Sequence, residues 1–255
     1  MEKDFTMNSK LSLKNKNILI TGVGKGIGYE LLKDFANRGA FVYGLTRSKT
    51  DLIKIGKSKN FKVFLGDVRD EKKIEKIFWV AKKDKRFING LVNNAGIRQR
   101  IKFENIKKKE IKEIFDINFF SIFRIMQIYF KYTRKYKIGA SIVNIGSIVG
   151  EQGFDSLVGY ASSKGALKSL TQSFAIEKAK YKIRANLINP GFIKTSYYEK
   201  FKMKKKLYNW TLSRIPQKRW GEPEEISALI SFLISDASNY ITGETINIDG
   251  GWTNS

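Results

Sequence analysis

The sequence predicts an α/β fold, a single domain built on a doubly wound parallel sheet of about seven strands with helices on both faces. Short apolar runs alternate with longer amphipathic segments along the chain, and this alternation is typical of βαβ units. A glycine-rich turn lies between the first apolar run and the first amphipathic segment. The chain has no repeat or low-complexity linker and only three prolines, so we expect one domain over residues 1–255.

The first half of the chain begins with a buried strand and a helix whose apolar face can be read directly. Ile27, Leu31, Leu32 and Phe35 have the three- and four-residue spacing of such a face, and Gly39 follows its end. Short apolar runs then mark each further strand. The expected elements are a strand at 17–21, a helix at 27–37, strands at 41–45 and 61–65, a helix at 70–82 and a strand at 88–93.

The second half of the chain continues the alternation after a long helical region. Because crossovers between parallel strands are right-handed, such units wind the sheet in both directions, and ligands bind at the carboxyl ends of the strands. The expected elements are the helical region at 107–136, a strand at 140–145, a helix at 158–179, a strand at 183–188, a helix at 224–234 and a strand at 245–248.

The composition excludes several kinds of chemistry. The 255 residues include no cysteine and no histidine. Disulfides, thiolate nucleophiles, a Ser-His-Asp triad and metal sites with Cys or His ligands are therefore impossible, and we expect no metal. Any acid–base chemistry must use Tyr, Lys, Asp or Glu.

The net charge is unusually high, at +24 from 48 Lys and Arg against 24 Asp and Glu. Clustered cations would indicate a nucleic-acid or membrane partner, but the lysines are spread along the chain and form runs only at 107–109 and 204–206. We interpret the charge as compositional drift and expect no nucleic-acid or membrane partner. Residues 1–10 lack the apolar segment of a signal peptide, and no stretch is long enough to span a membrane, so we expect a cytoplasmic protein.

The glycine-rich turn that follows the first strand predicts a nucleotide site. Its glycines have the spacing G-x-x-x-G-x-G rather than G-x-G-x-x-G. Glycines let the backbone turn tightly and approach a pyrophosphate, whose charge is favoured by the amino terminus of the following helix. The residues of this Rossmann-type site are Thr21, Gly22, Gly24, Lys25, Gly26, Ile27 and Gly28.

Tyr160 and Lys164 are four residues apart in a predicted helix, so their side chains share one face. The ammonium group, together with a cationic nicotinamide ring, would lower the pKa of the phenol from its usual value near 10. The spacing alone also suits an exposed helix face. The neighbours favour a site: Ser147 follows one strand, Asn93-Asn94-Ala95-Gly96 follows another, and Asn118 lies in the helical region between them.

With these motifs the sequence resembles the short-chain dehydrogenase/reductase family, from about Leu11 to Trp252. The glycine motif, Asp67-Val68, Asn-Asn-Ala-Gly, Asn118, Ser147, Tyr160 with Lys164, and Pro190-Gly191 occur in the family's order and spacing. The resemblance implies that Tyr160 is the general acid and base and that Ser147 hydrogen-bonds the substrate oxygen. It implies that Lys164 lowers the pKa of Tyr160 and binds the nicotinamide ribose, and that Asn118 holds a water that relays protons.

The resemblance also implies where the rest of the cofactor binds. Asp67 and Val68 would meet the adenine, Asn94 the ribose beside it, and Ile193 with Thr195 the nicotinamide amide and the phosphates. The implied cofactor site is completed by Ala95, Gly96, Pro190 and Gly191.

The end of the second strand predicts NADP(H) rather than NAD(H). An Asp or Glu there usually binds the ribose 2′-hydroxyl of NAD(H), but the chain has Thr46 and Arg47 and no carboxylate before Asp51. The guanidinium of Arg47 suits a phosphate, Lys25 projects from the glycine turn toward the same corner, and Thr46 adds a hydroxyl donor. The family resemblance agrees with this prediction.

The segment 192–215 lies where this family has its substrate lid, and it carries Tyr197, Tyr198, Phe201 and Trp210. Arg98 and Arg100 follow the Asn-Asn-Ala-Gly motif and could hold a substrate carboxylate together with Ser147. They are equally consistent with a solvated loop.

We therefore expect an NADP(H)-dependent oxidoreductase that interconverts a ketone and a secondary alcohol, on a sugar acid or polyol as in the gluconate 5-dehydrogenase and 2-deoxygluconate dehydrogenase branch. One alternative is a 3-oxoacyl-acyl-carrier-protein reductase, and another is a non-catalytic protein that binds nucleotides or polyanions. The family resemblance implies a homotetramer.

Overall fold

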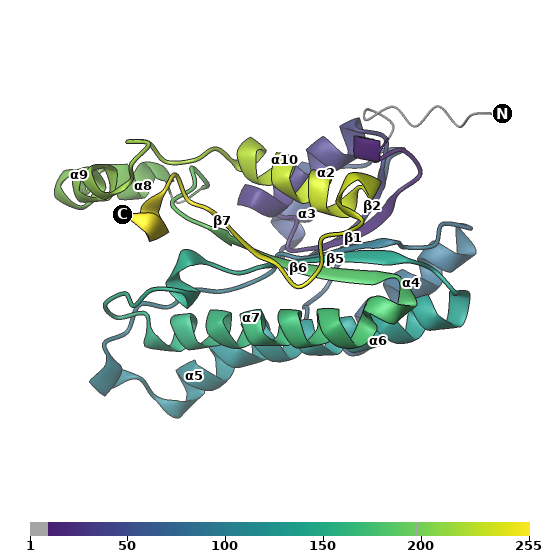
Figure 1. The fold of residues 1–255 in the computed structure, drawn as a ribbon, viewed down its shortest axis with the longest axis horizontal. Helices are drawn as coiled ribbons and strands as arrows, with labels where there is room; N and C mark the ends of the chain where they lie inside the picture. The colour runs from purple at the N-terminus through teal and green to yellow at the C-terminus, as the bar shows by residue number, and fades with distance from the viewer. Residues whose placement is uncertain (1–9, 197) are drawn as a thin grey trace.

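The computed structural model describes residues 10–196 and 198–255, and in this part of the chain seven strands form one parallel sheet (Figure 1). The order across the sheet is β3-β2-β1-β4-β5-β6-β7, so the chain winds outward from β1 in one direction and then from β4 in the other. The predicted fold class is confirmed. The strands are β1 Asn17–Thr21, β2 Phe41–Thr46, β3 Phe61–Leu65, β4 Gly90–Asn93, β5 Ala140–Ile145, β6 Ile183–Pro190 and β7 Thr245–Ile248.

Helices cover both faces of the sheet (Figure 1). On one face, α2 and α10 contribute Phe35 and Ile230 to a core shared with β1. On the other face, α4, α6 and α7 contribute residues such as Ile77, Ile125 and Leu167. The helices are α2 Gly26–Asn37, α3 Lys49–Ile55, α4 Glu71–Lys83, α5 Lys108–Phe115, α6 Ser121–Tyr136, α7 Val158–Lys178, α8 Tyr198–Lys202, α9 Lys205–Arg214 and α10 Pro223–Ile234.

The structure differs from the prediction in several places, including a β6 that extends to Pro190 rather than ending at residue 188. Helix α3 was not predicted, because it is short and buries no residue, so no apolar periodicity marks it. Helices α8 and α9 form much of the segment that was predicted only as a lid. The helical region 107–136 is divided by a π-helical turn at Asp116–Phe120. The fourth strand begins at Gly90 rather than at residue 88.

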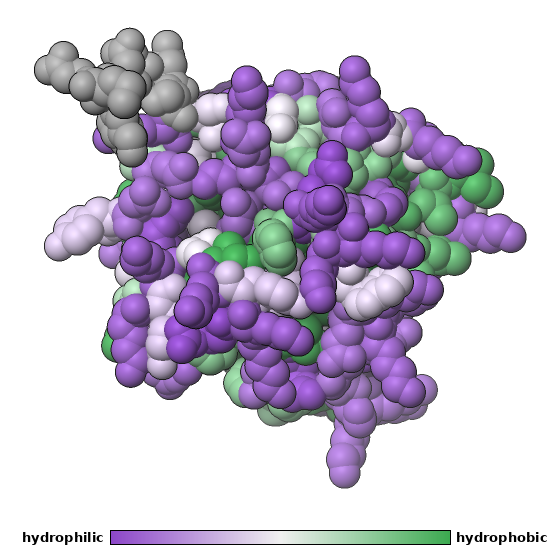
Figure 2. Space-filling view, turned by 90° about the vertical axis from the view of Figure 1, so that its right-hand side faces the viewer, coloured by the Kyte–Doolittle hydropathy of each residue, from purple (hydrophilic) through white to green (hydrophobic). Residues whose placement is uncertain are grey.

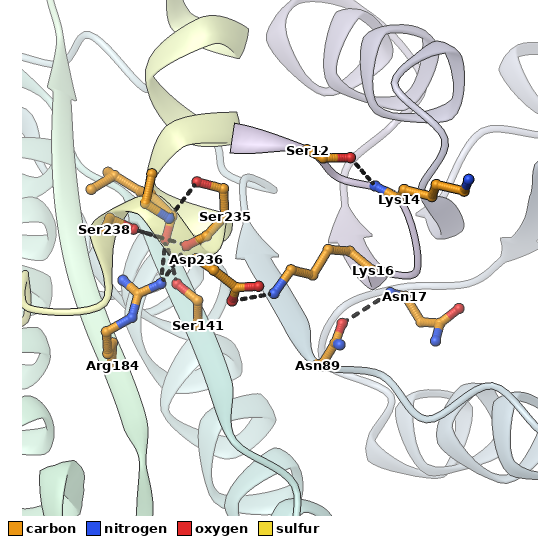
Figure 3. Close-up of polar contacts among 12 residues, drawn as sticks. Ser12, Lys14, Lys16, Asn17, Asn89, Ser141, Arg184, Ser235, Asp236 and Ser238 are labelled. Atoms are coloured by element: carbon orange, nitrogen blue, oxygen red, sulfur yellow. Dashed lines mark hydrogen bonds and ion pairs between the residues drawn. The ribbon is translucent and has the colours of Figure 1, made fainter. Parts of the chain in front are cut away.

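Polar contacts link the amino ends of the strands to the segment that follows α10 (Figure 3). The Lys16 ammonium lies 2.6 Å from the Asp236 carboxylate, and the Arg184 guanidinium donates to the carbonyls of Leu233 and Ser235 at 2.9 and 3.1 Å. Figure 2 views the molecule from this end, where hydrophilic side chains cover most of the surface. The predicted site residues lie at the opposite edge, at the carboxyl ends of the strands.

Two sequence-based predictions fall on residues outside the described part of the chain. The proposed absence of a signal peptide concerns residues 1–10, of which the structure describes only Lys10. Tyr197, one of the aromatic residues noted in the lid, also lies outside the described residues. No helix among the residues that the structure describes is long and apolar enough to cross a membrane.

Candidate active site

A cavity of about 590 Å³ opens where β1, β2, β3 and β4 end. It is bordered by the glycine turn, by the end of β2 and by the loops after β3 and β4. Most residues predicted to bind a cofactor line it. These are Gly22, Gly24, Lys25, Gly26, Ile27, Thr46, Arg47, Asp67, Val68, Asn94, Ala95, Gly96 and Thr195.

The glycine turn has the shape that a pyrophosphate requires. Gly22 and Gly26 have φ values of +75° and +57°, which favour glycine. A Cβ at Gly28 would lie 2.1 Å from the Gly22 carbonyl oxygen, so the turn can close only on glycine. Lys25, the N-cap residue of α2, makes no side-chain capping hydrogen bond, and the first N–H groups of the helix remain available to an anion. These residues fit a dinucleotide.

Seven residues that were predicted to bind the cofactor do not line this cavity. Thr21 is buried, and its hydroxyl accepts the backbone N–H groups of Asn94 and Ala95, each at 3.1 Å. The side-chain amide of Asn94 donates to the Thr21 carbonyl at 3.0 Å, so these residues fix the turn. Gly28, Tyr160, Lys164 and Pro190 do not line this cavity either, Gly191 lines the neighbouring cavity, and Ile193 lines a third one.

The four predicted catalytic residues come from three separate parts of the fold. Tyr160 and Lys164 lie one turn apart on α7, and the Lys164 ammonium is 5.8 Å from the centre of the Tyr160 ring. Ser147 follows β5 at the start of a short helical turn, and its hydroxyl is hydrogen-bonded to Tyr160. Asn118 lies in the π-helical turn between α5 and α6.

The protein groups around Tyr160 do not, on balance, lower the pKa of its phenol, whereas a lower pKa was predicted from Lys164 together with a cationic nicotinamide ring. Burial raises the pKa of the Tyr160 phenol, and the hydrogen bond with Ser147 and the positive charge of Arg98 oppose this increase. Lys164 donates to the backbone carbonyl of Ile145 at 2.7 Å, and burial lowers the pKa of Lys164 to about 8. The protein groups therefore keep Tyr160 protonated, in the form that can donate a proton to a carbonyl oxygen.

Asn118 is fully buried and joins the end of β4 to α7. Its side chain accepts the N–H of Ile97 and donates to the carbonyl of the same residue, both at 2.9 Å, and it donates to the Ser163 hydroxyl at 3.1 Å. A Cβ at Gly96 would lie 3.2 Å from Asn118 Oδ1 and 3.8 Å from Lys164 Nζ. The backbone at Gly96 therefore passes between Asn118 and Lys164.

Sequence reasoning missed Asn189, which positions Ser147. The buried Asn189 side chain accepts the Ser147 backbone N–H at 2.9 Å. It donates to Asn247 at 3.0 Å and to Glu151 at 3.2 Å. A polar residue at the end of an apolar strand, directly before Pro190, was the available signal.

Asp51 was also missed, because its place in the sequence put it beyond the end of β2. The structure places it in the wall of the 590 Å³ cavity, near Thr46 and Gly24. Asp67, by contrast, was predicted and is held by Arg69, at 2.8 and 2.9 Å. The hydrogen bonds from Arg69 lower the pKa of the Asp67 carboxyl.

A second cavity of about 260 Å³ brings Arg98 and Arg100 together with Ser147. The segment 192–215 closes one side of it through Phe201 and Trp210. Tyr198 packs instead against Trp220, with ring centres 5.2 Å apart. Phe192, Leu207 and Thr211 of the same segment also line the cavity. The remaining walls are mostly apolar and consist of Ile148, Val149, Phe154, Asp155, Leu157 and Gly191.

In the described part of the chain, no group of three or more Asp and Glu could hold a metal ion. The residues that line the two cavities instead suit an organic cofactor in the first cavity and its substrate in the second. A nicotinamide cofactor bound in the first cavity would supply or accept a hydride, and the hydroxyls of Tyr160 and Ser147 are the groups that would donate hydrogen bonds to a substrate oxygen.

The fold and this arrangement of side chains define an oxidoreductase that works with a nicotinamide dinucleotide. The chain belongs to the short-chain dehydrogenase/reductase family, as the resemblance implied. A family model described as "Enoyl-(Acyl carrier protein) reductase" matches residues 22–253, which is most of the chain.

Relatives and solved structures of this family match nearly the full chain. A 3-oxoacyl-acyl-carrier-protein reductase of Thermotoga maritima is 36% identical over 94% of this chain and 99% of its own length. The 5-keto-D-gluconate 5-reductase of Escherichia coli is 32% identical, over 96% and 98%. The structure of a gluconate 5-dehydrogenase from Burkholderia cenocepacia in complex with NADP and tartrate has a TM-score of 0.88 and 26% identity, and the match covers 97% of this chain and 98% of that one.

Proposed function

We propose that this protein is an NADP(H)-dependent oxidoreductase that interconverts a ketone and a secondary alcohol on a sugar acid or polyol. The observation that carries the proposal is the meeting of Arg98, Arg100 and Ser147 around one 260 Å³ cavity. Two guanidinium groups beside the group that polarises a carbonyl oxygen suit a substrate with a carboxylate. The names of the relatives that act on keto-gluconate and gluconate support this substrate class.

The roles of the catalytic residues follow from their surroundings. Tyr160 holds its proton because burial raises the pKa of the phenol, and in reduction this proton goes to the substrate oxygen. Ser147, which shares a hydrogen bond with Tyr160, donates to the same oxygen as it becomes negative. Lys164, whose ammonium lies 5.8 Å from the centre of the Tyr160 ring, would bind the nicotinamide ribose, and Asn118 would hold the water that connects Lys164 to solvent.

The preference for NADP(H) is proposed from the far end of the first cavity. Lys25, Thr46 and Arg47 all line it there, and Arg47 is exposed. A guanidinium and an ammonium group can bind the 2′-phosphate that distinguishes NADP(H) from NAD(H). The NADP in the Burkholderia gluconate 5-dehydrogenase structure supports this assignment.

The test compares an acidic and a neutral substrate of similar size, a keto sugar acid and a neutral ketone. In the variant Arg98→Ala/Arg100→Ala, KM for the acid should rise about ten- to a hundredfold, because a charge-assisted hydrogen bond contributes roughly 1.5–3 kcal/mol. KM for the neutral ketone should change little. The neutral ketone also controls for the effect of Arg98 on the pKa of Tyr160.

The matched control is Lys102→Ala/Lys109→Ala, which removes the same charge from the following segment without touching the cavity. An equal increase in KM for both substrates in the arginine variant would contradict the sugar-acid proposal. It would mean that the two arginines do not bind a substrate carboxylate.

The mostly apolar walls of the 260 Å³ cavity favour a second candidate, a 3-oxoacyl-acyl-carrier-protein reductase. Phe154, Phe192, Phe201 and Trp210 would contact an acyl chain, and the net charge of +24 would favour an acidic carrier protein. The 36% identical relative carries this name. A spectrophotometric screen of keto sugar acids, polyols and 3-oxoacyl thioesters with NADPH and NADH separates the two candidates.

The assembly and the compartment complete the proposal. We propose one domain per chain, with a substrate lid at 192–215, and a homotetramer. Exposed aromatic side chains on the turn before α6 and on α6 itself, Phe120 and Phe123, support an interface there. We propose a cytoplasmic location, where NADP(H) is available.

A further inference from the structure

Asp51 lies where two cofactor-binding elements meet. Helix α3 begins directly after β2, and its N-cap residue Ser48 accepts the Asp51 backbone N–H at 3.1 Å. This bond caps the first turn of α3, and Asp51 lines the 590 Å³ cavity from that turn.

The carboxylate of Asp51 packs against the glycine turn. A Cβ at Gly24 would lie 2.4 Å from Asp51 Oδ2 and 2.9 Å from the Thr46 hydroxyl oxygen. The carboxylate is therefore wedged between the turn that would hold the pyrophosphate and the strand end that would hold the ribose. A side chain larger than hydrogen at position 24 would displace it.

No hydrogen bond or ion pair to the Asp51 carboxylate is found in residues 10–196 and 198–255. The carboxylates of Asp34, Asp67, Asp84 and Asp116 do have Lys or Arg partners. A half-buried acceptor without a partner, in a cavity wall, is placed to serve a ligand. Arg47 and Lys25 border the same cavity and bring opposite charge.

We propose that Asp51 is a cofactor-selectivity residue that accepts a hydrogen bond from the ribose 2′-hydroxyl of NAD(H) and repels the 2′-phosphate of NADP(H). It thereby limits the preference for NADP(H) that Arg47 and Lys25 confer. The inference rests on the proposed use of NADP(H). The proposal also explains why the carboxylate of Asp51 lies beside the end of β2, although the last residues of β2 include no Asp or Glu.

The experiment titrates the full-length protein with NADPH and with NADH at one ionic strength and follows the cofactor fluorescence, so that it requires no substrate. In Asp51→Asn, the ratio of the two Kd values should move toward NADPH by about fivefold, as expected for the loss of one partly screened charge interaction. Binding of NADPH should tighten and binding of NADH should weaken. The control Glu75→Gln removes one exposed carboxylate from α4 and should leave the ratio unchanged.

A second titration needs no substitution and therefore does not depend on how the variant folds. Wild-type protein should bind 2′-deoxy-NADH about threefold or more weakly than NADH, since the hydroxyl that Asp51 accepts is missing. An unchanged Kd ratio in a folded Asp51→Asn variant, or equal binding of the two NADH forms, would overturn the proposal.

The variant Arg47→Ala separates this inference from the proposed function. If wild-type protein prefers NADPH and Arg47→Ala removes the preference, but Asp51→Asn does not change it, only the role of Asp51 is wrong. If wild-type protein binds NADH more tightly and Arg47→Ala has no effect on the ratio, the proposed use of NADP(H) is wrong.

Discussion

At the scale of a single residue, the surroundings of Tyr160 in the fold determine the pKa of its phenol. Its phenol is buried beside the hydroxyl of Ser147 and near the charge of Arg98. Burial favours the neutral phenol, and the other two groups favour the phenolate. In the proposed mechanism, Tyr160 releases its proton to the substrate oxygen in reduction and recovers it in the reverse reaction.

Replacing Tyr160 by Phe removes the proton donor and leaves the ring. Turnover should fall by about 10² to 10⁴, because Ser147 alone cannot protonate the substrate oxygen. NADPH should still bind, since most of the cofactor contacts lie in the 590 Å³ cavity, which Tyr160 does not line. Steady-state rates and a fluorescence titration measure the two properties, and turnover within about threefold of wild type would remove Tyr160 from the mechanism.

At the scale of elements, the carboxyl ends of β5, β6 and β7 are joined by one buried side chain. Asn189 of β6 accepts from Ser147 after β5 and donates to Asn247 of β7. A Cβ at Gly146 would lie 2.2 Å from Asn189 Oδ1, so the chain after β5 must approach Asn189 closely. The position of Ser147 therefore depends on how β5, β6 and β7 are aligned, because Asn189 contacts residues of all three chain segments.

The variant Asn189→Ala tests this coupling. Loss of buried hydrogen bonds should lower the free energy of unfolding by about 1–3 kcal/mol, and kcat should fall by about tenfold or more because Ser147 loses its support. The control is Asn186→Ala in the same strand, where a buried amide donates to Ile241 and accepts from Glu244. That control should lose similar stability and keep its kcat. Equal kcat values for the two variants would refute the positioning role of Asn189.

The same elements show which parts of the site a sequence can predict. Tyr160 and Lys164 could be singled out because residues four apart in a helix share a face, and the structure places both on α7. Gly22 could be singled out because a turn between a strand and a helix has a recognisable glycine spacing, and it lines the 590 Å³ cavity. Asn189 and Asp51 were not found. Each acts on a residue far along the chain, Ser147 and Gly24 respectively, and only the assembled sheet brings these pairs together.

The fold itself was predictable for a similar reason. Every strand of a parallel sheet that is covered on both faces is a short apolar run, so β1 and β5 stand out in the sequence. Helix α3 buries none of its seven residues and left no apolar pattern. The π-helical turn at Asp116–Phe120 changes the hydrogen-bond pattern within a continuous helical region, and side-chain periodicity does not report that change.

At the scale of the whole molecule, exposed aromatic rings contrast with a charged surface. Phe120 is 53% exposed and Phe123 is 36% exposed, while the chain carries a net charge of +24. Such rings on one helical surface of a strongly charged protein are typical of a protein–protein contact. In the proposed homotetramer a second copy would cover them.

Light scattering after size-exclusion chromatography tests the assembly. Wild-type protein should have about four times the chain mass of 29.3 kDa, and Phe120→Asp/Phe123→Asp should shift it to smaller species, because a buried charge destabilises an apolar interface. The control Ile53→Asp changes an exposed residue of α3, on another surface, and should keep the wild-type mass. A wild-type monomer would exclude the homotetramer.

The 590 Å³ cavity and the 260 Å³ cavity have no lining residue in common. Substitutions at residues of the two cavities that lie more than about 7–10 Å apart and share no partner should therefore combine additively. During evolution, the substrate specificity of such an enzyme can then change while its cofactor specificity stays the same, or the reverse. Cofactor specificity and substrate specificity can likewise be optimised in separate variant libraries, and the best substitutions can then be combined in one chain that keeps Ser147 and Tyr160.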